Sequence, residues 1–232
     1  MPRSPTRLLL RDELVGFAKS KVMIVMWVVL PLLAMGAYLL LPDEMFESQG
    51  LSRQHFTATS FVAFLMSSLA GTVAALMVAV DLVSERNRKV YELFVIRPIP
   101  RAAIVWAKFI AVFTCVAIAC VASIVAGLLV DWLRGAPVTA TDFADLVKPL
   151  VSLVGVIAIS TGVGVVFGTL SKSILAAVIL ILYLGQNLAF VPMLPIYLGI
   201  LPNQFWLIML VSFGIAIALG FVAARIFKNT EF

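Results

Sequence analysis

Uncharged apolar runs that are long enough to cross a lipid bilayer restrict what this chain can fold into more than any other feature. A helix crosses the hydrocarbon core, about 30 Å thick, with roughly 20 apolar residues. Runs of that length lie at 22–41, 56–80, 109–130 and 149–170. Of the 232 residues, 62% are apolar and only 12% are charged, so a water-soluble fold could not cover so much apolar surface. The sequence therefore predicts an all-α integral membrane protein.

Residues 173–224 carry no charge and provide room for two further spans. We place these spans at 174–191 and 205–224, because three prolines in the intervening "PMLPIYLGILPNQ" would interrupt a helix. Irregular backbone is tolerated at membrane depth only where protein covers it, so this connector is expected to enter the outer leaflet and return. The expected architecture is a single transmembrane domain over residues 1–232, with six transmembrane helices and an outer re-entrant segment.

The distribution of Lys and Arg predicts the orientation in the membrane. With the N-terminus in the cytoplasm, 14 of the 17 basic residues fall in the predicted inner segments. This positive-inside pattern places both termini on the cytoplasmic side of a cell (inner) membrane. Because the basic residues flank spans, the net charge of +5 indicates topology and not a nucleic-acid partner.

Residue types that carry catalysis are scarce. His55 is the single histidine, so a histidine metal cluster or a histidine-based triad is not possible. Cys115 and Cys120 lie inside one apolar run and are expected to act as small hydrophobic residues. "GTLSKS" at 168–173 lacks the glycine before the lysine of a phosphate-binding loop. We therefore expect no catalytic residue, no metal and no cofactor bound by this chain, and none of the six runs contains an ionisable residue that could drive transport by itself.

Small and polar residues inside the spans suggest close helix packing. Two stripes recur every four positions, with Ser67, Gly71 and Ala75 in one span and Ser160, Gly164 and Gly168 in another. Such stripes let helices approach closely, either within the chain, as we expect, or at a seam between subunits. Ser67, Gln186 and Asn187 are candidates for lining a substrate path, and the alternative for the two amides is hydrogen bonding between helices.

The stretch "SERNRKVYELFVIRPIPR", residues 84–101, places seven charges between two spans. Glu85 with Lys89 and Arg88 with Glu92 form oppositely charged pairs four residues apart, which favours a helix. The prolines at its end stop that helix. A charged helix with an apolar stripe indicates a docking surface, with an inert loop as the alternative.

Residues 85–108, "ERNRKVYELFVIRPIPRAAIVWAK", resemble the intracellular loop of permeases of the ABC-2 (type V) transporter family. The matching positions are Glu85, Arg86, Arg88, Glu92, Leu93, Pro98, Ile99, Arg101 and Lys108. Lys89 and Ala107 stand where the family usually has glycine, and Phe94 replaces a usual leucine. Residues 1–21, with an apolar stripe and flanking basic residues, look like the N-terminal elbow helix of the family, so the likeness covers the whole chain.

The resemblance implies the permease subunit of an ATP-driven ABC exporter. Such a subunit pairs with a second copy or a homologous permease and binds two copies of an ABC ATPase, which use ATP and Mg. The loop at 84–101 would be the coupling helix on that ATPase, through Glu85, Arg86, Arg88, Lys89, Glu92, Leu93, Phe94, Arg97, Pro98 and Arg101. Pro192, Pro195 and Tyr197 would belong to an outer gate. The alternatives are a structural or regulatory subunit of an ATPase complex and, less favoured, an intramembrane enzyme.

Overall fold

The computed structural model describes residues 5–40, 58–88, 100–133, 140–185 and 205–229, and within these ranges the chain is helical with no strand. The helices are α1 (Pro5–Ala18), α2 (Lys21–Leu40), α4 (Ala58–Asn87), α6 (Arg101–Leu133), α7 (Ala140–Leu170), α8 (Ile174–Leu180), the π-helical turn η1 (Ile181–Gly185) and α11 (Phe205–Asn229). In lipid a helix satisfies its backbone hydrogen bonds internally, which is why runs so apolar fold in this way.

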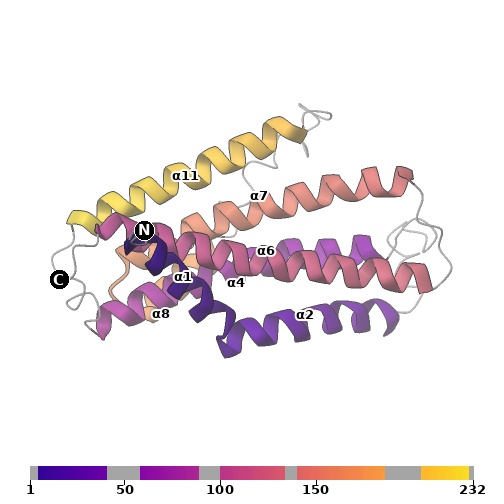
Figure 1. Ribbon diagram of the computed structural model, residues 1–232, viewed down its shortest axis with the longest axis horizontal. Coiled ribbons are helices and arrows are strands. Elements are labelled where there is room, and N and C mark those ends of the chain that lie inside the picture. Colours follow the sequence, from indigo (N-terminus) through magenta and orange to yellow (C-terminus); the bar gives the residue numbers. More distant parts are fainter. Residues whose placement is uncertain (1–4, 41–57, 89–99, 134–139, 186–204, 230–232) are drawn as a thin grey trace.

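The long helices lie side by side along one axis in an elongated bundle (Figure 1). Helix α6 occupies the middle and contacts α1, α2, α4, α7 and α11. The short helix α1 lies across one end of the bundle (Figure 1), where the C-terminal end of α4 and the N-terminal end of α6 also meet. We call this end, formed by α1, residues 81–87 of α4 and residues 101–108 of α6, the charged end.

Helices α4 and α7 pack closely through the small residues that the sequence singled out. A Cβ atom added to Gly164 would lie 2.4 Å from the carbonyl oxygen of Ala75, and one added to Gly168 would lie 2.8 Å from the Cα of Ala79. Nearer the other end of the contact between α4 and α7, a Cβ at Gly71 would lie 2.7 Å from the Ser160 hydroxyl oxygen. For Gly71, Ala75, Ser160, Gly164 and Gly168, the prediction that the stripes pack within the chain is confirmed.

Aromatic and cysteine residues complete the packing around α6. The Trp106 ring leaves no room for a Cβ on Gly220 of α11 and meets the Phe221 ring edge to face, with 5.3 Å between the centroids. The indole N–H of Trp27 in α2 donates to the carbonyl oxygen of Cys115 over 3.2 Å. Cys115 and Cys120 are buried free thiols, so the prediction that they act as small hydrophobic residues is confirmed.

Three helical segments in the described ranges are long and apolar enough to cross a membrane: Arg101–Leu129, Leu153–Leu170 and Met209–Asn229. A shorter apolar helix covers Ile174–Gly185, which is the described part of the span predicted at 174–191. The connector expected to form an outer re-entrant segment lies outside the described residues.

The described parts of the charged stretch at 84–101 belong to the two flanking helices. Its first residues, 84–87, are the last turn of α4, and Arg101 is the first residue of α6. Helix α4 continues past its apolar run because no proline or glycine interrupts it there. Residues 89–99 lie outside the described residues.

Candidate functional site

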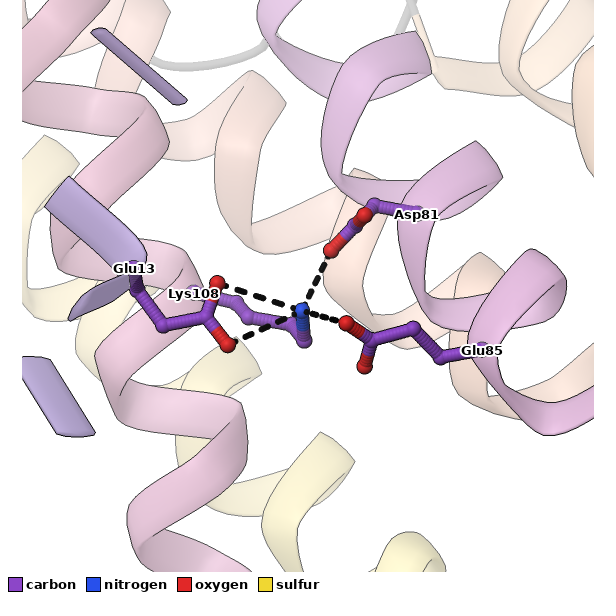
Figure 2. Close-up of polar contacts among 4 residues, drawn as sticks. All are labelled: Glu13, Asp81, Glu85 and Lys108. Atoms are coloured by element: carbon purple, nitrogen blue, oxygen red, sulfur yellow. Dashed lines mark hydrogen bonds and ion pairs between the residues drawn. The ribbon is translucent and has the colours of Figure 1, made fainter. Parts of the chain in front are cut away.

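A lysine with no exposed surface lies at the centre of the charged end. The ammonium of Lys108 contacts carboxylates from two other helices: Glu13 of α1, and Asp81 and Glu85 of α4 (Figure 2). Its Nζ lies 2.8 Å from Glu85 Oε1 and 3.1 Å from Glu13 Oε1, and it also donates to the Asp81 carboxylate. We call these four residues the Lys108 cluster.

Helix geometry explains how the cluster forms. Asp81 and Glu85 are four residues apart, so both project from one face of α4. Lys108 lies two turns into α6, on the side that faces α4 and α1. The Phe17 ring of α1 adds a further contact, with its centroid 5.8 Å from the Lys108 ammonium, within the range of a cation–π interaction.

The cluster holds more negative than positive charge. Three carboxylates face one ammonium, and their side chains keep 17% (Glu13), 32% (Asp81) and 25% (Glu85) of their surface exposed. Burial raises the pKa of Glu13 above its ordinary value, although the ion pair with Lys108 opposes this shift. The Oε2 atom of Glu85 is buried without a hydrogen-bond donor among the described residues. Removing one partner of a buried ion pair costs about 3–5 kcal/mol, so the cluster depends on its lysine.

This geometry suits an anchor between helices better than a ligand site. The ammonium of Lys108 already occupies the space between the three carboxylates (Figure 2). In the described part of the chain, no group of His, Cys, Asp and Glu is placed to hold a metal ion. The cluster therefore links α1, α4 and α6 through ion pairs.

Arg86 forms a second link at this end of the bundle. Its guanidinium donates to the carbonyl oxygens of Thr169, over 2.7 Å, and Ser171, over 3.1 Å. These carbonyls lie at the C-terminal end of α7 and in the turn to α8, where intrahelical donors run out and the helix dipole favours a cation. Arg86 thus joins α4 to the α7–α8 turn.

Arg101 makes a related contact from the first residue of α6. Its guanidinium donates to the carbonyl oxygen of Lys228, at the C-terminal end of α11, over 3.4 Å. The two arginines that border the segment between α4 and α6 therefore both bind helix C-termini.

The predicted docking residues are only partly described. Glu85, Arg86 and Arg101 make the contacts given above, and Arg88 is exposed. The remaining predicted residues lie outside the described residues: Lys89, Glu92, Leu93, Phe94, Arg97 and Pro98 in the docking segment, Gln186 and Asn187 in the substrate path, and Pro192, Pro195 and Tyr197 in the outer gate. Ser67 belongs to α4.

Sequence reasoning missed the Lys108 cluster. The spacing rule pointed to Lys89, which lies outside the described residues, and did not point to Lys108, which binds the Glu85 carboxylate from 23 residues along the chain. A signal was present, because Asp81 and Glu85 end one span and Lys108 begins the next, at matching depth in an antiparallel pair. Nothing in the local pattern pointed to Glu13, which lies 95 residues from Lys108.

Comparison with known proteins supplies the family. Comparison with curated proteins gives no matching sequence. A family model described as ABC-2 family transporter protein matches residues 9–187, well over half of the chain. The matched range contains the whole Lys108 cluster, Arg86 and the helices α2, α4, α6, α7 and α8. The chain therefore belongs to the ABC-2 transporter family and is an ABC-2 type permease, a multi-pass membrane transport protein.

Proposed function

We propose that this chain is the membrane-spanning subunit of an ATP-driven exporter. In this proposal it crosses a cell (inner) membrane six times with both termini in the cytoplasm, and it pairs with a second copy or a homologous permease. Two copies of a separate ABC ATPase supply the energy from ATP and Mg. Family membership supports the transporter subunit, and the apolar helices support its place in the membrane.

The observation that carries the proposal is the anchoring of both sides of the charged segment. On one side, Glu85 binds Lys108 and Arg86 binds the end of α7, and on the other, Arg101 binds the end of α11. A segment held in this way passes a displacement on to the helices and does not absorb it as a free loop would. This suits a contact through which an ATPase acts on the permease.

The anchoring also divides the predicted docking residues into two groups. Glu85 and Arg86 use their charged groups inside the permease, so we assign them to transmission and not to ATPase contact. Contact with the ATPase then falls to exposed Arg88 and to the rest of the segment, residues 89–98.

The test is recovery of an ATPase with the tagged permease from native membranes. We expect Glu92→Arg and Phe94→Asp to reduce the co-purified ATPase and its activity by at least about tenfold, since a loss of 1.4 kcal/mol in binding is a factor of ten. Asp12→Arg, an equal charge reversal at an exposed position of α1, is the matched control and should retain the ATPase. Undiminished ATPase binding and activity in both segment variants would refute the docking assignment.

A second measurement separates transport from a regulatory role. The uncharged spans favour a lipid-like or amphipathic cargo over a strongly charged solute. In proteoliposomes, such a cargo should stimulate ATP hydrolysis, and alanine at Gln186 or Asn187 should change the cargo concentration that gives half stimulation. ATP hydrolysis that no amphipathic cargo alters would favour a structural or regulatory subunit.

A further inference from the structure

Lys108 is shared by three helices, α1, α4 and α6, which also pack against one another through apolar side chains. Helix α1 rests on the bundle through buried Leu9 and Phe17, and its partly buried Leu10 and Leu14 pack against the same core. Apolar contacts of this kind are non-directional, so they hold α1 to the bundle without fixing its position along α6. The ion pair of Lys108 with Glu13 supplies the directional contact.

We propose that Lys108 is a positioning residue that makes α1, α4 and α6 move as one body at the charged end. A displacement of the segment between α4 and α6 then reaches α1 as well, although α1 is far away in sequence. The use made of this coupling depends on the proposed function, but the coupling itself is a property of the isolated permease.

The charges of the cluster predict a graded result. Glu13 is the cluster's contribution from α1, so its removal frees α1 while Asp81 and Glu85 keep α4 attached to α6. Lys108 supplies the cation for all three carboxylates, so its removal leaves them facing one another and separates α4 from α6 as well. A lysine that merely filled space would not produce this order of effects.

Distances between spin labels on the permease alone, in lipid nanodiscs, test the proposal. In a background with Cys115→Ala and Cys120→Ala, labels at Gly16→Cys and Ala102→Cys report on α1 and α6. Labels at Asn87→Cys and Ala102→Cys report on α4 and α6. All three label positions are exposed, and a Cβ added at Gly16 meets no atom within 4 Å.

We expect Glu13→Ala to abolish the narrow distance peak between α1 and α6 while the peak between α4 and α6 persists. Lys108→Met should abolish both peaks, and Lys108→Arg should retain both because it keeps the charge. Asp12→Ala, which removes a neighbouring exposed acid, is the control and should change neither. An unchanged peak between α1 and α6 in Glu13→Ala would overturn the proposal.

Two further measurements separate a loss of folding from a loss of coupling, and the coupling from the proposed function. If Lys108→Met does not fold, Lys108→Met with Asp81→Asn and Glu85→Gln removes the uncompensated carboxylates of α4 and should fold with α1 still released. In complexes with the co-purified ATPase, Glu13→Ala should retain ATPase binding but lose the ATP-driven movement of α1. Failure to recover any ATPase would count against the proposed function alone, whereas an α1 that follows α6 in Glu13→Ala would count against the coupling.

Discussion

A single added methyl group at Gly164 tests the seam between α4 and α7. The Cβ of Gly164→Ala would lie 2.4 Å from the carbonyl oxygen and 2.6 Å from the Cα of Ala75, where 3.4–4 Å is ordinary contact. Both atoms belong to the backbone of α4, so no side-chain rotation relieves the overlap. The two helices must therefore separate by about 1 Å, which also loosens the contact of Gly168 with Ala79.

The magnitude follows from the cost of overpacking, about 1–3 kcal/mol for a well-packed interior. Alanine is also a better helix former than glycine by about 0.5–1 kcal/mol, which partly offsets that cost. Gly214→Ala in α11 serves as the matched control, because a Cβ there meets nothing within 4 Å. The difference between the two variants isolates the overpacking contribution, and we expect Gly164→Ala to be less stable by about 1–3 kcal/mol.

The assay is the free energy of unfolding in mixed micelles, measured by titration with a denaturing detergent, with the oligomeric state recorded in parallel. Equal stability of the Gly164→Ala and Gly214→Ala variants would refute the packing argument. A weakened dimer with unchanged stability of the subunit would instead place this stripe at a seam between subunits.

Three other predictions concern the charged end, the topology and the outer segment. Arg86→Ala should lower the unfolding free energy by about 1–3 kcal/mol, because two carbonyl groups at the end of α7 lose a charged donor. Arg86→Lys should recover part of this stability. Equal stability of the wild type and Arg86→Ala would contradict the capping role. In intact cells, an impermeant thiol reagent should label Gly50→Cys but not Ser84→Cys, and labelling of the second would reverse the predicted orientation. Cysteines introduced along 191–202 should cross-link two subunits and suppress transport while ATPase binding persists; full access of reagent at every position without a cross-link would mean that this segment is an ordinary surface loop.

Much of the helical structure was predictable because lipid leaves the backbone little choice. An apolar run must bond its own peptide groups, so runs such as 109–130 and 205–224 predict helices without knowledge of any neighbour. The small-residue stripes likewise predicted close helix contacts from spacing alone. Helix ends were less predictable, because polar residues outside the apolar runs also join the helices, as at 101–108 of α6 and 140–148 of α7.

Only the tertiary structure decided which partners these features meet. The stripe around Gly164 specifies a helix that can be approached closely, but the identity of α4 as its neighbour depends on how all the helices assemble. Glu85 shows the same limit for charge, since the i,i+4 rule concerns one helix and could not indicate the buried lysine on another helix that binds this carboxylate. Sequence by itself therefore determined the helices and their apolar surfaces, through local backbone and solvent energetics. The Lys108 cluster, whose members are up to 95 residues apart, exists only because packing brings three helices together and removes water from the Lys108 ammonium between them.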